Sequence, residues 1–160
     1  MADPSALARI ADFLAAHSTL ALATVDAQGR RCAAAVFYAH DERLNLYFLS
    51  EERTAHGQNL AAGPDVAATI QSDGQDWQSI QGLQMRGRAA RVPAGELPHA
   101  AALYGRKYAF VGALLAGSQG PEVLAGPLAR ARFYVLRPDW LRLTDNTVRF
   151  GYKLEIELGA

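Results

Sequence analysis

The amino-acid sequence predicts a mainly β protein in which helices flank an antiparallel barrel of six or more strands. Apolar and β-favouring runs of strand length recur along the chain. Short polar turns, Asp26–Gly29 and His40–Arg43, join the first three runs, and such short connections join antiparallel neighbours. No linker, repeat or low-complexity segment divides the chain, so residues 1–160 are expected to form a single domain whose strands close into a small barrel.

A helix over Asp3–His17 is expected to open the chain. Asp3 is a candidate N-cap with Pro4 at the first helical position, and Ile10 and Leu14 share one apolar face at helical spacing. This helix is expected to cover one end of the sheet. Three strands follow, over Thr19–Val25, Arg31–Ala39 and Leu44–Ser50. The small side chains of the second strand would let another group approach its backbone closely.

The third strand leads through a polar turn into a short helix, expected over Thr54–Ala62 with Thr54 as its N-cap. Backbone N–H groups and the positive end of the helix dipole favour an anion at such a helix start. Arg53, Thr54 and His56 add a guanidinium, a hydroxyl and an imidazole within one turn. The stretch therefore indicates a phosphate site, with a well-capped helix and solvated side chains as the alternative.

The next strands are expected over Val66–Ser72 and Gln78–Val92. Gly82 and Gly87 interrupt the longer one, and glycines inside a strand favour bulges or a barrel corner. A second substantial helix is expected over Glu96–Phe110. Its tyrosines Tyr104 and Tyr108 are interpreted as core packing, and Arg106 and Lys107 beside them as a solvated edge.

The C-terminal third is expected to return to β structure after a loop. The segment Val111–Pro127 is rich in Gly and Ala and is interpreted as a mobile loop with one or two helical turns that covers a site. A strand over Ala131–Leu136 is expected to end at Pro138. The last elements are expected to be a hairpin of Trp140–Thr144 with Val148–Phe150, and a strand over Tyr152–Leu158 that alternates at period two.

Composition excludes several classes of function. The formal net charge is zero and no basic run is present, which argues against binding to duplex nucleic acid. The single cysteine, Cys32, rules out an internal disulfide and a cysteine-based metal cluster, and the four histidines show no ligand spacing. No apolar run is long enough to span a bilayer and the start lacks signal-peptide features, so no membrane association is expected and the cytoplasm is the expected compartment.

No nucleotide-binding loop, zinc-protease motif or nucleophile elbow occurs, and no pair of carboxylates suggests acid–base catalysis. Any redox chemistry is therefore expected to come from a bound cofactor.

The order of elements resembles that of the pyridoxamine 5′-phosphate oxidase-like family of FMN-binding split barrels. Three segments carry the resemblance: TLALATVDAQGRRCAAAVFY, LNLYFLSEERTAHGQNLAAGPDVAATI and IQGLQMRGRAARV. The ending LTDNTVRFGYKL is similar to a small, poorly characterised branch of that family. The resemblance implies a split β-barrel that binds FMN at the interface of a homodimer.

The resemblance also implies which residues contact the flavin. Thr54 and His56 stand where the family has an S-x-K phosphate motif, with Arg53 adjacent, and the neutral imidazole of His56 would make phosphate binding depend on pH. The ring would lie against the backbone of the second strand, beside the end of the third and near the long strand. These positions are Val36, Phe37, Tyr38, Leu49, Ser50, Gly82 and Gln84. Trp77, Trp140, Tyr152 and Lys153 are further candidates, some of them from the partner subunit.

The resemblance does not extend to the motif with which the true oxidases bind their substrate. Their R-x-H-D-R-type motif corresponds here to Arg142-Leu143-Thr144-Asp145-Asn146, which lacks the His and the second Arg. The expected function is therefore an FMN-binding oxidoreductase acting on an unknown small molecule rather than on pyridoxamine phosphate. A relative that binds a deazaflavin or haem, a non-catalytic flavin- or ligand-binding stress-associated module, and a barrel without ligand remain as alternatives.

Overall fold

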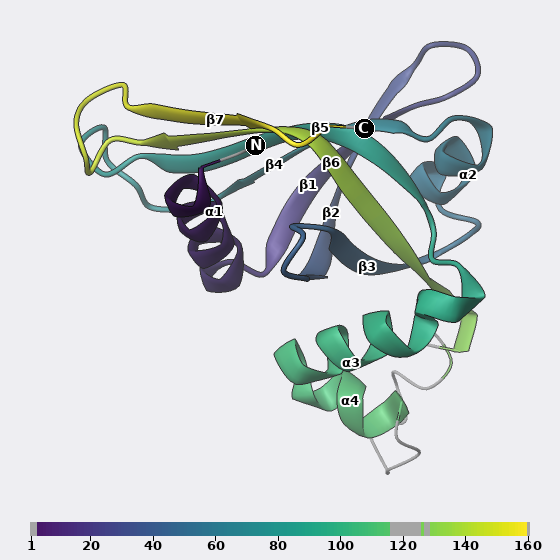
Figure 1. Cartoon of the computed structure of the whole chain (residues 1–160). Coiled ribbons are helices and arrows are strands. Elements are labelled where there is room, and N and C mark those ends of the chain that lie inside the picture. The colour runs from purple at the N-terminus through teal and green to yellow at the C-terminus, as the bar shows by residue number, and fades with distance from the viewer. Residues whose placement is uncertain (1–2, 116–125, 127–128, 160) are drawn as a thin grey trace.

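Six strands close into a barrel in which every pairing is antiparallel (Figure 1). The computed structural model describes residues 3–115, 126 and 129–159. The sheet runs in the order β3-β2-β1-β4-β5-β6-β7, and β3 also pairs with β6, so the first six strands form a closed ring to which β7 is added. The strands are β1 (Thr19–Val25), β2 (Arg31–His40), β3 (Leu46–Glu51), β4 (Asp65–Gln71), β5 (Gln81–Arg91), β6 (Ala131–Asp145) and β7 (Lys153–Glu157). The predicted fold class is confirmed.

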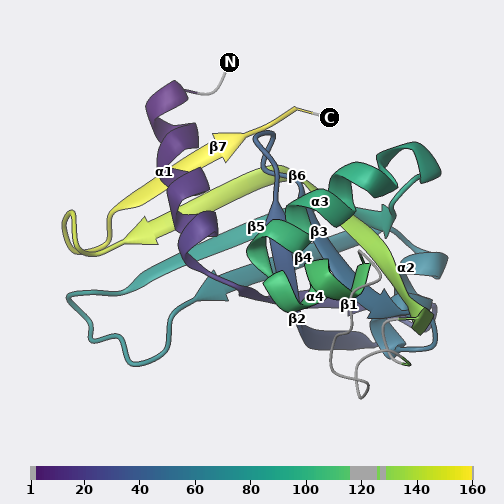
Figure 2. The ribbon, with the colours of Figure 1, turned by 90° about the horizontal axis from the view of Figure 1, so that it is seen from below.

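The helices lie around this barrel, as Figures 1 and 2 show. They are α1 (Pro4–Ala16), α2 (Ala55–Ala62), a 3₁₀ turn η1 (Ala94–Glu96), α3 (Leu97–Lys107) and α4 (Ala109–Leu115). The predicted N-cap of α1 is confirmed, because the Asp3 carboxylate accepts a hydrogen bond from the Ser5 backbone N–H at 3.0 Å. Ile10 and Leu14 on the inner face of α1 are fully buried in the barrel core.

Two hydrophobic cores hold the elements together. The larger one fills the barrel with inward side chains such as Leu22, Phe48 and Leu136, and includes the buried face of α1. The smaller one lies outside the barrel, where Tyr104 of α3 packs with Tyr47 of β3 and other residues of β2, β3 and β6. The α3–α4 pair is therefore attached to the barrel by buried aromatic and aliphatic contacts.

Strand β6 corrects the prediction that Pro138 ends a strand. It runs unbroken from Ala131 to Asp145 and pairs with β3, β5 and β7 in turn. The ladder to β5 shifts register between Arg86 and Gly87, and Gly87 is the partner of Pro138. Proline cannot donate to a ladder and is tolerated at a bulge, which explains why the strand continues.

Two further expectations need correction, and the helical turns expected after Val111 are found in part. Val148–Phe150 is a turn and not a strand, because the partner of the Trp140–Thr144 stretch is β7. The helix expected over Glu96–Phe110 is divided into η1, α3 and α4, with a break at Tyr108. Of the expected loop Val111–Pro127, residues 111–115 belong to α4, whereas residues 116–125 and 127 lie outside the described residues.

Candidate functional site

The predicted anion site at the start of α2 is a compact group of two hydroxyls and an imidazole. Ser50 ends the inward row of β3 and lies 2.6 Å from His56, measured from Oγ to Nε2. Thr54 lies 3.3 Å from the same hydroxyl, and its Oγ1 accepts the Gly57 backbone N–H at 3.1 Å as the N-cap of α2. The structure therefore groups Thr54 and His56 around Ser50, a residue that was expected beside the flavin ring and not in the phosphate site.

The electrostatics of this group come mainly from Arg53. Burial lowers the pKa of His56 below its usual value, so its imidazole is neutral near neutral pH and offers hydrogen bonds but no charge. Arg53 is 73% exposed and donates from Nε to Glu51 at 2.5 Å. An exposed ion pair of this kind is weak, so the guanidinium can leave Glu51 for a phosphate at little cost.

The three predicted β2 residues point in alternating directions. Phe37 is 56% exposed on the outer face of the sheet, whereas Val36 and Tyr38 face the barrel core. The backbone expected to contact a flavin ring already has partners within the chain: the Tyr38 carbonyl accepts from the Tyr108 hydroxyl at 2.7 Å, and the Tyr38 N–H donates to the Ser18 carbonyl at 3.0 Å. In this region Phe37 is therefore the predicted residue whose side chain is open to a ligand.

Leu49, Gly82 and Gln84 are divided between two places. Leu49 packs with the α3–α4 core and is half-buried. Gly82 and Gln84 lie on β5 and line a shallow cleft of about 500 Å³. The bulge expected at Gly82 is absent, because the register of β5 is regular there, and the shift falls at Gly87 instead.

On the outer face of the sheet, a row of cross-strand partners runs from the second strand through β1 and β4 to Gln84 on β5. Ala35, Ala21, Thr69 and Gln84 are direct cross-strand partners in that order. Three strand spacings amount to about 14 Å, so Gln84 lies roughly one flavin length from β2 along a continuous row. The next row begins with Ala33, Ala23 and Ala67, so methyl groups cover the outer face of the sheet here. We call these two rows, Ala35–Ala21–Thr69–Gln84 and Ala33–Ala23–Ala67, the alanine face.

Helix α3 supplies residues next to β2 that were not predicted as part of a site. Tyr104 and Tyr108 donate their hydroxyls to the Phe37 and Tyr38 carbonyls, at 3.4 and 2.7 Å. Lys107 lies with its Nζ 4.2 Å from the centre of the Tyr38 ring and is half-buried. Their helical spacing indicated only a packed face, because nothing in the local sequence shows which strand they meet.

Within the described residues, the structure shows neither a cluster of metal-ligating side chains nor a helix suited to span a membrane. No group of three or more His, Cys, Asp or Glu side chains there is placed to hold a metal ion. Among the same residues, no helix combines the length and the apolar character that crossing a bilayer requires.

Comparison with known sequences gives a family match over most of the chain. Residues 6–144 match the profile of the pyridoxamine 5′-phosphate oxidase family. A UPF0306 protein of Enterobacter sp. strain 638 is 32% identical over 123 residues, which cover 77% of this chain and 76% of the relative.

Comparison with solved structures supports the same barrel. A heme-binding protein from Mycobacterium smegmatis superposes with a TM-score of 0.74 at 21% identity, over 99% of this chain but only 60% of that longer chain. HutZ, a heme storage protein from Vibrio cholerae, gives a TM-score of 0.64 at 24% identity, over 82% of this chain and 88% of its own. At these identities the similarity concerns the fold alone.

Proposed function

The chain belongs to the pyridoxamine 5′-phosphate oxidase family, and on that premise we propose that it binds FMN as a homodimer and acts as an oxidoreductase on a small molecule. The flavin ring would lie on the alanine face, and its phosphate at the start of α2. Strand β3, which carries Ser50, pairs directly with β2, so the two halves of this site are held by adjacent strands.

The observation that carries the proposal is the alanine face. In the two rows of this face, the outward positions on β2, β1 and β4 hold only alanines and one threonine, with Phe37 exposed beside them. Without larger side chains above the backbone, a planar ring can come into van der Waals contact with the sheet over its whole area. Gln84 at the end of the row offers both a donor and an acceptor to the polar edge of such a ring.

The donors at the start of α2 fit a phosphate monoester. Ser50, Thr54 and His56 supply two hydroxyls and an imidazole within hydrogen-bond distance of one another. Arg53 supplies the fixed positive charge that the neutral imidazole lacks. The Thr54 cap fixes the first turn of α2 and thereby orients the group.

When bound, FMN would supply hydride or electron exchange at its N5 atom. The role of this chain would be to anchor the phosphate, to orient the ring and to shield it through a second subunit. Oxidation of pyridoxamine phosphate is disfavoured. Thr144 and Asn146 stand at the positions of the His and the second Arg of the family's substrate motif, and the retained Asp145 is buried and accepts from Arg9 at 2.8 Å.

Haem binding is the second candidate, because two of the similar folds belong to a heme-binding and a heme storage protein. Two of the four histidines, His17 and His56, offer it little support. Both ring nitrogens of His17 have partners within the chain, at 2.7 and 2.8 Å, and the Nε2 atom of His56 lies against Ser50. A visible absorption spectrum of the purified protein, recorded before and after FMN is added and the excess removed, separates the candidates. Retained flavin bands support FMN, a Soret band supports haem, and a protein that retains neither contradicts both proposals.

The phosphate site is tested by removing its charge and its hydroxyl. The variant Arg53→Ala/Thr54→Ala should bind FMN at least about tenfold more weakly, because hydrogen bonds to a charged group contribute about 1.5–3 kcal/mol each. Quenching of flavin fluorescence during a titration measures the affinity. Thr54→Ser keeps the hydroxyl and the helix cap and should bind FMN as the wild type does. Equal affinity of the double variant and the wild type would contradict the assignment.

A further inference from the structure

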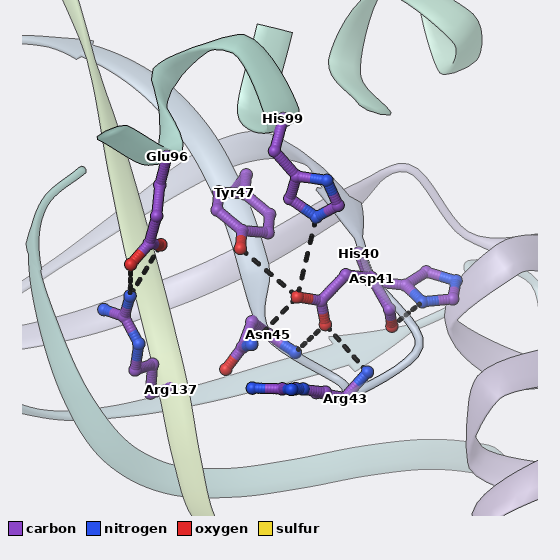
Figure 3. A network of polar contacts seen from close by, with 8 residues as sticks. All are labelled: His40, Asp41, Arg43, Asn45, Tyr47, Glu96, His99 and Arg137. Carbon is purple, nitrogen blue, oxygen red and sulfur yellow. Dashed lines mark hydrogen bonds and ion pairs between the residues drawn. The ribbon is translucent and has the colours of Figure 1, made fainter. Parts of the chain in front are cut away.

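A second cleft lies at the other end of β3, and Figure 3 shows the polar network in its wall. It has a volume of about 870 Å³ and lies between the β2–β3 turn, the start of α3 and Ala11 of α1. Clefts of this size accommodate small organic molecules. Tyr47 of β3 lines this cleft, and Ser50 of the proposed phosphate site lies three residues further along the strand, about 10 Å away.

The Asp41 carboxylate in this cleft is held by several hydrogen bonds. Its Oδ1 atom accepts the backbone N–H groups of Arg43 and Asn45, both at 2.9 Å. Its Oδ2 atom accepts the Asn45 side-chain amide at 2.9 Å and the Tyr47 hydroxyl at 3.2 Å. The Nε2 atom of His99 faces the same oxygen at 3.9 Å. The carboxylate is therefore occupied by the protein itself and holds the turn, Tyr47 and His99 in place.

The second carboxylate of the wall is paired with an arginine. Arg137 of β6 donates from one nitrogen to both oxygens of Glu96, at 2.9 and 2.8 Å. Glu96 is thus paired with a cation, whereas both oxygens of Asp41 are engaged by neutral donors of the protein. Glu42 also lines the cleft, from the exposed turn.

Positive groups remain available in the same cleft. The guanidinium groups of Arg43 and Arg106 line it, and neither has a carboxylate within 4 Å among the residues that the structure describes. His40 also lines the cleft, and its Nδ1 donates to the Asp41 carbonyl at 3.1 Å. The start of α3 at Glu96 has no side-chain cap, and its positive dipole end adds to the field of these groups.

An apolar surface completes the cleft. Ala11 of α1, Leu103 of α3 and the ring of Tyr47 line it beside the charged groups. We propose that this cleft binds a small organic anion, a compact apolar body that carries one phosphate or carboxylate group. Arg43 and Arg106 take the anionic group, His99 lies beside it in the lining, and the apolar body packs against Leu103 and Ala11. The assignment does not depend on the flavin proposal.

The test uses phenyl phosphate as the probe and the histidine side chains as reporters. In ¹H–¹⁵N spectra of the full chain, phenyl phosphate should shift the ring signals of His40 and His99 with saturation and leave His17 unchanged. Phenol, which lacks the anionic group, should bind at least tenfold more weakly. The signal of His56 reports separately on the proposed flavin phosphate site, so failure at one site is distinguishable from failure at the other.

Removing the two guanidinium groups provides the matched variant. Arg43→Gln/Arg106→Gln should weaken phenyl phosphate binding at least tenfold, whereas Arg149→Gln, an exposed arginine in the β6–β7 turn, should not. Circular dichroism confirms that the variants are folded. Unchanged His40 and His99 signals at about 50 mM probe would overturn the proposal. So would equal binding of phenol and phenyl phosphate, or full affinity in the double variant.

Discussion

Lys107 links three elements through a single ammonium group. It donates to the carbonyls of Leu14 and His17 at the end of α1, at 3.4 and 2.5 Å, and lies over the ring of Tyr38 on β2. Burial lowers the pKa of Lys107 to about 8. The contacts hold the ammonium in place, while its desolvation makes the charged form costly.

This pKa has a consequence for stability. Between pH 8 and about 10.5 the unfolded chain binds more protons at this lysine than the folded chain does, so the contribution of Lys107 to the free energy of unfolding rises with pH. In chemical denaturation, the wild type should therefore gain stability relative to Lys107→Met across this window. Lys153→Met, at the other lysine of the chain, provides the control. A difference that stays constant or falls with pH would contradict the assigned shift.

At the scale of single residues, the sequence predicted local chemistry and missed tertiary contacts. Thr54 as N-cap and its grouping with His56 follow from spacing within one turn, and the structure has both. The roles of Lys107 and Tyr108 depend on partners about ninety residues away, at His17 and Ser18 between α1 and β1. A solvent-exposed helix edge and a buried one have the same residue spacing. The sequence therefore wrongly indicated that the Lys107 side chain is solvated.

At the scale of elements, β6 shows what a pattern within one strand cannot reveal. Pro138 is a strong local break signal, but the β-bulge that accommodates it depends on Gly87 in a different strand. A Cβ atom on Gly87 would lie 2.2 Å from the Arg137 carbonyl oxygen and 2.7 Å from the Pro138 Cα. The two strands can approach this closely only because residue 87 has no side chain.

Gly87→Ala should therefore destabilise the protein by about 1–3 kcal/mol or more, because the nearest atoms belong to backbone that cannot move without breaking the ladder. The midpoint of urea denaturation measures the loss. Gly63→Ala is the matched control: its Cβ would meet nothing within 4 Å and its φ of −162° suits any residue, so it should stay within about 0.5 kcal/mol of the wild type. Similar midpoints for both variants would show that the bulge relaxes freely.

At the scale of the whole molecule, the barrel was predictable but its outer surfaces were not. Strand patterns and short turns indicated the antiparallel ring, and its closure between β3 and β6 leaves none of these six strands with an open edge. The alanine face appears only when β1, β2 and β4 are set in register, since each strand alone contributes only one or two of its outward alanines. The cleft at Asp41 likewise joins α1, α3 and a turn.

The proposed homodimer places Phe37 at its interface. Phe37→Asp would put a charge on the apolar surface that the second subunit covers, so it should shift the protein toward monomer and weaken FMN binding. Phe150→Asp is matched, because Phe150 is also exposed and also contacts one aromatic ring, Trp77. Sedimentation velocity should show monomer for the first variant only. A monomeric wild type, or equal dissociation of both variants, would contradict this interface.

The closure of the ring also sets the order in which the chain can fold. The last ladder pairs Leu46 with Leu136, so most of the barrel sequence lies between two strands that must meet. Contacts of such long separation slow folding, because the entropy of closing the loop is lost before the contacts form. During synthesis on the ribosome, the edges of β3 and β5 that pair with β6 stay unpaired until β6 emerges. This interval is when the nascent chain is most exposed to aggregation and to chaperones.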